Sequence, residues 1–341
     1  MTSLMFPQCR GSECRESAVS FSDFCWAHTD KPAYLAALPR AVQAFGAAPS
    51  RLNFKKVECQ DVDFVNLDLR GSSFSQAHLR NIHFVGSDLS GSDLIGAHLH
   101  GCDFVGSDLS AANMTRAVFE RTSFSHSDLR SAIMTEAHFR EADFMGARMH
   151  GVILWNADLS GARYLKKKNF AKPDPRAGEE AALSEKDPLA ACESYRLLKH
   201  HFYSRGLYED ASWAAYRELT MERRHFFEKK DLRFIPSLLM DILCGYTEKP
   251  IRVTASSLAI ILSFAAVYHI FRVPVHSVDG GLAGLWDCVY FSFITFTTVG
   301  YGDFTPKAVP LFRLITCAEA FSGPFMAGLY IFTLTRRYAA G

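Results

Sequence analysis

The chain has 341 residues, of which 48% are hydrophobic and 21% are charged, and its formal net charge at pH 7 is +1. This length suggests two or three domains, and a charge near zero gives no support for nucleic-acid binding, so no nucleic-acid partner is expected. Cysteine, arginine and glutamate interrupt the first apolar residues, so the start of the chain does not predict a signal peptide.

The first segment, residues 1–50, contains three of the nine cysteines within its first 28 residues. Cys9, Cys14, Cys25 and His28 have the spacing C-x4-C-x10-C-x2-H. Thiolates and an imidazole are the ligands of structural zinc, and a segment this short needs such a metal to fold. The pattern therefore predicts a structural Zn²⁺ site. Three free thiols beside an ordinary histidine, or a redox sensor, are the alternatives.

Residues 51–166 show a period of five. Every fifth residue from Phe54 to Tyr164 is apolar, over twenty-three repeats, and the residue two places before it is nearly always small from Ser72 onward. This period fits neither a helix nor a flat strand, but it fits a square coil with one pentapeptide on each side. The apolar residue would fill the interior, and the small residue would fit the crowded corner.

This pattern resembles the pentapeptide-repeat family, which implies a right-handed quadrilateral β-helix. Some members of that family mimic DNA, a role that needs a strongly anionic face. Between Arg51 and Leu165 there are fourteen acidic and eleven basic residues, which is a weak excess for mimicry. A scaffold that stabilises assembly, or binds an unknown protein or ligand on a flat face, is favoured.

Three segments follow the repeats. Residues 167–187 are rich in Lys, Glu, Pro and Ala and predict a mobile linker. Residues 188–230 carry two apolar patterns of helical period separated by Gly206, and they predict a helical hairpin, faintly like a tetratricopeptide unit. Residues 231–246 predict a short helix lying flat on the inner membrane leaflet, with Gly245 placed to end it.

The last segment, residues 247–341, predicts two membrane-spanning helices at 251–272 and 309–335. A shorter apolar stretch at 284–297 is too short to span and suits a re-entrant pore helix. Basic residues precede the first span and follow the second, which places both ends in the cytoplasm. These flanking basic residues are Lys229, Lys230, Arg233, Lys249, Arg252, Arg336 and Arg337.

The run Thr-Thr-Val-Gly-Tyr-Gly-Asp lies between the two expected spans, at residues 297–303. Glycines at alternate positions allow successive carbonyl oxygens to point the same way, and a ring of such loops can replace the water shell of a cation. One loop makes a quarter of such a cage, so four chains are expected to meet on one axis. The run resembles the signature sequence of potassium channels. The resemblance implies an all-α tetrameric pore that holds K⁺ at a filter formed by Thr298, Val299, Gly300, Tyr301 and Gly302, supported by Thr297 and Asp303.

Three residues of the second span are gating candidates: Glu319, Gly323 and Pro324. Glycine and proline together weaken a helix, so a hinge is favoured over a static kink. Glu319 is a charge at membrane depth that could line the cavity or buttress the pore helix. In some bacterial relatives, a glutamate three residues before the first filter threonine bonds the aspartate after the filter. Ile294 stands at that place, so Asp303 needs another partner.

We therefore expect a potassium-selective channel rather than an enzyme, because no catalytic set of residues stands out. It would be a homotetramer in the inner membrane of a prokaryotic cell, gated at its inner helices and regulated by the cytoplasmic repeat domain. The alternative is a membrane-anchored scaffold or sensor that uses the repeat domain to bind partners and has little channel activity.

Overall fold

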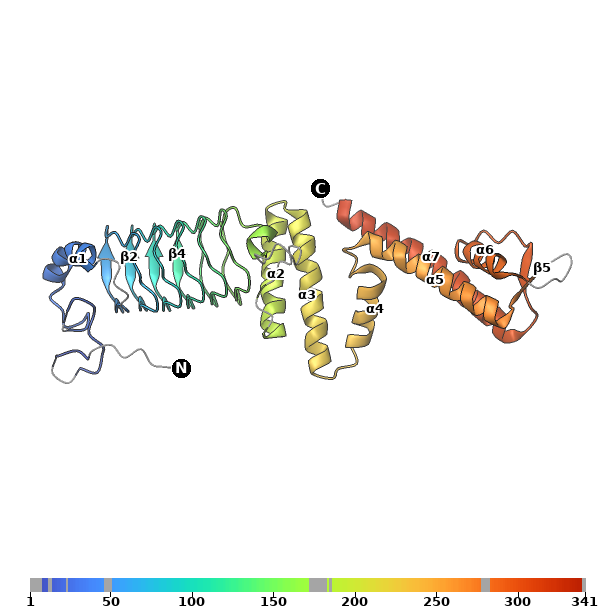
Figure 1. The fold of residues 1–341 in the computed structure, drawn as a ribbon, viewed down its shortest axis with the longest axis horizontal. Coiled ribbons are helices and arrows are strands. Elements are labelled where there is room, and N and C mark those ends of the chain that lie inside the picture. Colours follow the sequence, from blue (N-terminus) through green and yellow to red (C-terminus); the bar gives the residue numbers. More distant parts are fainter. Residues whose placement is uncertain are drawn as a thin grey trace. The chain divides into compact units, whose positions relative to one another are not determined.

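The computed structural model describes residues 8–11, 14–22, 24–45, 51–171, 183, 186–276 and 283–338 (Figure 1). It divides into two compact units, Met1–Glu222 and Arg223–Gly341, which are described separately below. Most of the linker expected at 167–187, and residues 277–282, lie outside the described residues.

Four short parallel strands mark one face of the first unit: β1 (Glu58–Gln60), β2 (His78–Arg80), β3 (His98–His100) and β4 (Val118–Glu120). Each strand pairs with the next at an offset of 20 residues, as in the register of Cys59 with Leu79. Isolated bridges on the other faces keep the same offset. Four pentapeptides therefore make one coil, which confirms the predicted quadrilateral β-helix.

The interior of this β-helix is filled as the period of five predicts. The apolar residue of each repeat is buried from Phe54 to Leu159, with at most 7% of its surface exposed. Phenylalanines one coil apart stack on each other, and Phe104 lies 4.7 Å from Phe84 and 5.3 Å from Phe124, measured between ring centroids. Small residues such as Ser107 and Ala112 are buried directly after the turns, and the backbone N–H of each closes a turn by donating to the carbonyl of the apolar residue three places earlier.

The last repeat departs from the prediction. Tyr164 occupies an interior position by period, but it is 57% exposed and has a positive φ of 58°. The chain leaves the coil here, and the short helix η1 (Lys167–Phe170) continues the ladder instead. The Asn169 carbonyl accepts a hydrogen bond from the backbone N–H of Met149, one coil earlier, and Phe170 is fully buried. The first residues of the expected linker therefore belong to the end of the β-helix.

The N-terminal segment packs against the other end of the β-helix. Helix α1 (Lys31–Phe45) contributes Tyr34 and Leu38 to the same core as Phe54. The backbone N–H of Ser20 donates to the carbonyl of Asn53 at 2.7 Å, and the Asn53 amide side chain donates to the carbonyl of Ala18 at 2.5 Å. The Asn53 backbone N–H also donates to the Ser20 hydroxyl at 2.6 Å, so both backbone groups of Asn53, which no earlier coil can pair, are hydrogen-bonded.

Two antiparallel helices complete the first unit. Helix α2 (Pro188–Ser204) begins after Asp187, whose carboxylate accepts hydrogen bonds from two backbone N–H groups of its first turn. Gly206, with φ of +69°, separates α2 from α3 (Tyr208–Glu228), as the sequence predicts. Their buried faces join the core of the β-helix. Glu218 of α3 ties the pair together by accepting from Arg196 at 2.7 Å and Lys199 at 2.6 Å.

The second unit is mainly helical. It contains α4 (Phe234–Cys244), α5 (Pro250–Phe271), α6 (Leu285–Phe296) and α7 (Pro310–Tyr338). A two-stranded antiparallel sheet joins β5 (Pro274–His276) to β6 (Phe304–Pro306) on either side of α6. Gly245 has a left-handed conformation and ends α4, as expected.

Helices α5 and α7 are long and apolar enough to cross a membrane. The candidate spans are Pro250–Phe271, with a mean hydropathy of 1.8, and Pro310–Thr335, with a mean hydropathy of 1.3. Only 22% and 17% of their most apolar windows are buried, whereas the core helix of a soluble protein is mostly buried. Their exposed apolar surfaces suit contact with lipid or with further copies of the chain.

Candidate functional site

The segment expected to form the filter, residues 298–302 (the filter segment), follows Thr297, which comes directly after helix α6. The backbone N–H of Gly284 donates to the Asp287 carboxylate at 2.8 Å, which fixes the start of this helix. At its other end, the carbonyl of Ile294 accepts from the backbone N–H groups of Val299 at 2.9 Å and Gly300 at 3.2 Å. The filter segment is therefore held against the last turn of α6, where a re-entrant pore helix was expected.

The backbone of the filter segment alternates in handedness. Thr298, Gly300 and Gly302 have φ angles of 59°, 50° and 82°, whereas Val299 and Tyr301 have no positive φ. Such alternation allows successive carbonyl oxygens to point to one side of the chain. A Cβ built on either glycine meets nothing within 4 Å, so the positive φ, rather than crowding within this chain, is what requires glycine there. A positive φ is also unusual for the β-branched Thr298.

Asp303 has a neighbour that the sequence reasoning missed. Its carboxylate accepts a hydrogen bond from the backbone N–H of Phe304 at 3.1 Å, and Tyr290, whose ring centroid lies 6.2 Å from that of Phe304, brings its hydroxyl into electrostatic interaction with the same carboxylate. Tyr290 lies one helical turn before Ile294 on α6 and therefore shares its face. Searching that face for a hydroxyl would have identified Tyr290.

Glu319 lies in the interior of the second unit and is fully buried. Its carboxylate accepts hydrogen bonds from two hydroxyl groups, those of Ser292 on α6 and of Tyr268 on α5, the latter at 2.5 Å. Ser292 also contacts the carbonyl of Ile261 at 2.8 Å. One carboxylate on α7 thus joins helices α5 and α6. Of the two roles that the sequence left open, this geometry favours the buttress.

Gly323 and Pro324 lie inside α7, which runs without a break from Pro310 to Tyr338. Gly323 faces the end of α6: a Cβ added to it would lie 1.7 Å from the carbonyl oxygen of Phe296. Only glycine permits this approach, because real Cβ contacts begin beyond 3.0 Å. The hinge remains a prediction, and the structure adds a packing requirement at Gly323 that the sequence pattern did not indicate.

Comparison with known proteins divides the chain in the same way. Residues 256–340 match the profile of a family described as "Ion channel", and residues 72–161 match pentapeptide repeats in four overlapping windows. The C-terminal part of this chain is an ion-channel pore domain, and the N-terminal part is a pentapeptide-repeat β-helix.

Two curated relatives align with short segments of the chain. "Potassium channel K1" of Plasmodium berghei is 38% identical over 66 residues, which cover 18% of this chain and 3% of the relative. "Two-pore potassium channel 1" of Arabidopsis thaliana is 46% identical over 46 residues, which cover 14% of this chain and 12% of the relative. The chain therefore spans a small fraction of the length of the relatives it matches.

Solved pentapeptide-repeat proteins resemble the first unit. One from the thylakoid lumen of Arabidopsis thaliana is 23% identical with a TM-score of 0.24, over 34% of this chain and 78% of its own. One from the cyanobacterium Cyanothece is 18% identical with a TM-score of 0.15, over 32% and 78%. At these scores, the fold assignment rests on the repeat matches and on the 20-residue hydrogen-bond ladder.

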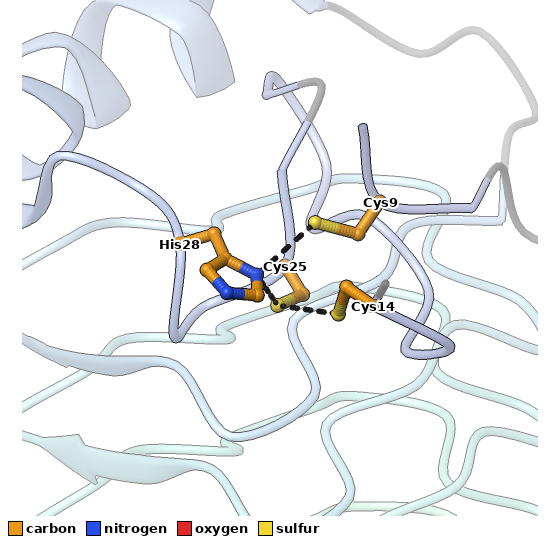
Figure 2. Close-up of side chains that lie close together, drawn as sticks. All are labelled: Cys9, Cys14, Cys25 and His28. Atoms are coloured by element: carbon orange, nitrogen blue, oxygen red, sulfur yellow. Dashed lines mark hydrogen bonds between the residues drawn. The ribbon is translucent and has the colours of Figure 1, made fainter. Parts of the chain in front are cut away.

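The four residues expected to bind metal come together ahead of the repeat domain (Figure 2). Their ligand atoms all lie within 4.8 Å of one another. The Sγ atoms of Cys14 and Cys25 are 3.7 Å apart, and Nδ1 of His28 lies 3.3 Å from Sγ of Cys25. A zinc tetrahedron with Zn–S bonds of about 2.3 Å places its thiolates about 3.8 Å apart, so the donor set fits this ion.

The surroundings of the cluster also suit a bound cation. Burial alone would raise the pKa of the Cys9 thiol, but hydrogen bonds from the backbone N–H groups of Cys25 and Gly11 and from the His28 ring lower it to about 6. A Cβ on Gly11 would lie 2.8 Å from Nδ1 of His28, so a larger residue there would crowd the ring. The surroundings favour the metal-binding thiolate form at Cys9, whereas at Cys14 a backbone hydrogen bond is outweighed by burial and by the sulfur atoms of Cys25 and Cys9, which raise its pKa.

Proposed function

We propose that this protein is a potassium-selective channel. The observation that carries the proposal is the filter segment: a Thr-Val-Gly-Tyr-Gly run with alternating backbone handedness, held at the end of a short helix between two candidate spans. Carbonyl oxygens of Thr298, Val299, Gly300 and Tyr301 would replace the hydration shell of K⁺. The alignment of the pore domain with potassium channels supports this choice of ion.

The channel would be a homotetramer, because one chain supplies one filter segment and a closed carbonyl cage needs four. Val299 and Tyr301 are 52% and 74% exposed in a single chain, which leaves them available for contact with neighbouring copies. We place the channel in the inner membrane of a prokaryotic cell, and the distribution of basic residues supports an orientation with both termini in the cytoplasm. Thr297 and Asp303 would support the filter, with the Tyr290 hydroxyl interacting electrostatically with the Asp303 carboxylate.

Opening would occur at the inner ends of the α7 helices, with Pro324 as the weak point of each helix. The repeat domain would then lie in the cytoplasm and regulate the pore by binding a protein or ligand. The Cys9–Cys14–Cys25–His28 cluster would hold a structural Zn²⁺ that stabilises the start of the β-helix, since Ser20, which lies between Cys14 and Cys25 in the sequence, bonds directly to Asn53 of the first coil.

A membrane-anchored scaffold with little channel activity is the alternative, because the repeat domain makes up much of the chain. A flux assay separates the two. The purified full-length protein is reconstituted into liposomes loaded with potassium, and efflux is followed with a fluorescent reporter of the resulting membrane potential. A channel gives efflux that depends on protein and is absent with sodium alone, whereas a scaffold gives none with either ion.

A further inference from the structure

The polar face of α4 carries a carboxylate that is nearly inaccessible to solvent. Asp241 is 8% exposed, although it lies on a helix whose other side chains are mostly exposed. A buried carboxylate is strongly unfavourable unless it is paired and hydrogen-bonded. The partners of Asp241 should therefore matter to the position of every helix that supplies one.

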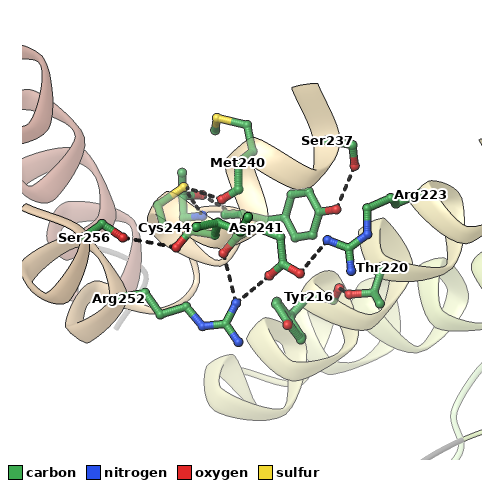
Figure 3. A network of polar contacts seen from close by, with 12 residues as sticks. Tyr216, Thr220, Arg223, Ser237, Met240, Asp241, Cys244, Arg252 and Ser256 are labelled. Atoms are coloured by element: carbon green, nitrogen blue, oxygen red, sulfur yellow. Dashed lines mark hydrogen bonds and ion pairs between the residues drawn. The ribbon is translucent and has the colours of Figure 1, made fainter. Parts of the chain in front are cut away.

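Two arginines from different helices bind this carboxylate (Figure 3). Nη1 of Arg223, near the end of α3, lies 2.5 Å from Oδ2, and Nη1 of Arg252, in the first turn of α5, lies 2.6 Å from Oδ1. Arg252 also donates to the Asp241 backbone carbonyl at 2.9 Å. The helix before α4 and the candidate span after it thus meet at one side chain.

Neighbouring contacts fix α4 on the same side. Ser237 and Tyr246 share a hydrogen bond of 2.7 Å between their hydroxyl oxygens, and the Arg223 guanidinium lies over the Tyr246 ring at 5.9 Å. Ser256 of α5 donates to the carbonyl of Ile242 at 3.2 Å. The contacts of Tyr246 hold the end of α4 next to Arg223, and the contact of Ser256 holds α4 next to α5.

The opposite face of α4 is apolar and exposed, which suits the membrane surface. Ile235, Leu238, Leu239 and Ile242 are 41–58% exposed. A short helix with this division lies in the interfacial plane of a bilayer. Asp241 and its partners Arg223 and Arg252, which we call the arginine clamp, therefore lie on the side of α4 that faces the protein. A shift of α4 along the membrane would move Asp241 relative to these two arginines.

Helix α3 is also paired with α2. In the first unit, the Glu218 carboxylate of α3 accepts hydrogen bonds from Arg196 and Lys199 of α2, and Glu218 is 6% exposed. Arg223 follows five residues later on the same helix.

We propose that Asp241 is a positioning residue that couples α3 to the first candidate span, so that a displacement of α3 changes the probability that the pore is open. This inference rests on the proposed channel function. Movement of α3 would pass through Arg223 to Asp241 and from Asp241 to Arg252 at the start of α5. The filter lies outside this path, so ion selectivity and unitary conductance stay as they are.

Single-channel recording of the full-length protein in bilayers tests the coupling. Asp241→Asn, which keeps the shape but removes the charge, should change the ratio of open to closed time by about tenfold, a typical allosteric coupling. Arg252→Gln should do the same, and the double variant should change the ratio no more than the larger single change, since both act on one link. Asp231→Asn is the matched control, because Asp231 pairs locally with Arg233 at a more exposed site and should leave the ratio within about twofold.

Additive effects, or an unchanged ratio in Asp241→Asn, would overturn the inference. If that variant fails to assemble, Arg252→Lys keeps the charge and should show a smaller change in the same ratio; no change there also overturns it. Hydrogen exchange provides a readout that needs no conduction: Asp241→Asn should increase exchange both at the end of α3 and at the start of α5. Unchanged exchange at either place contradicts the coupling, whereas a wild-type protein without current contradicts only the channel proposal.

Discussion

Replacing Gly323 by alanine tests the packing of the pore most sharply. The added Cβ would lie 1.7 Å from the carbonyl oxygen of Phe296, and ordinary contact begins near 3.4 Å, so α6 and α7 must separate by roughly 1.7 Å. The obstructing atom is backbone, which cannot rotate away as a side chain can. Overpacking of this kind costs about 1–3 kcal/mol, and more where backbone has to move.

The consequence should reach the filter, because Phe296 is followed directly by the filter threonines. Gly323→Ala is expected to lower the temperature at which the purified protein unfolds and to reduce potassium efflux from liposomes. Gly328→Ala is the matched control on the same helix, since a Cβ there meets nothing within 4 Å, and it should match the wild-type protein. Wild-type thermal stability and efflux in Gly323→Ala would refute the close packing. Pro324→Ala then tests the hinge separately, and it should change open probability without this loss of stability.

Three further predictions concern other parts of the chain. Glu319→Ala removes the acceptor of the buried Tyr268 hydroxyl and one of the two acceptors near Ser292, which keeps the Ile261 carbonyl, so it should destabilise the pore domain by about 1–3 kcal/mol and impair sustained current. Glu319→Gln, which keeps an acceptor, should do less, and equal effects would contradict the buttress. Phe104→Ala should destabilise the β-helix by about 3–5 kcal/mol in thermal unfolding, and the exposed Val65→Ala by less than about 0.5 kcal/mol. Metal analysis of the purified protein should find one zinc per chain. The zinc should be lost in Cys14→Ser but kept in Cys317→Ser. Wild-type protein that contains no zinc, together with a Cys14→Ser variant of unaltered stability, would refute the metal site.

The sequence predicted the elements whose signal repeats or is local. The period of five determines both the coil and its interior, because each repeat meets the next at the same offset. The conformation of the filter segment is local as well, because Gly300 and Gly302 can adopt a positive φ without help from distant residues. Gly206 and Gly245 marked helix ends for the same reason.

The sequence could not predict pairings between residues far apart in the chain. Glu319 contacts Tyr268, 51 residues earlier, and Arg223 contacts Asp241 across a turn whose geometry no periodicity specifies. The exposure of Tyr164 is a similar case. The period of five places Tyr164 inside. At the end of the β-helix, however, Asn169 makes the hydrogen bond to the preceding coil and Phe170 is buried in the core, so the tyrosine stays outside.

The central claim is that the Thr298–Gly302 segment conducts potassium and excludes sodium. Its most direct test is the reversal potential of the reconstituted full-length protein with potassium on one side of a bilayer and sodium on the other. We predict a reversal potential far from zero and of the sign that potassium permeation requires, and a value near zero for Gly300→Ala. A reversal potential near zero in the wild-type protein, despite measurable current, would contradict the account.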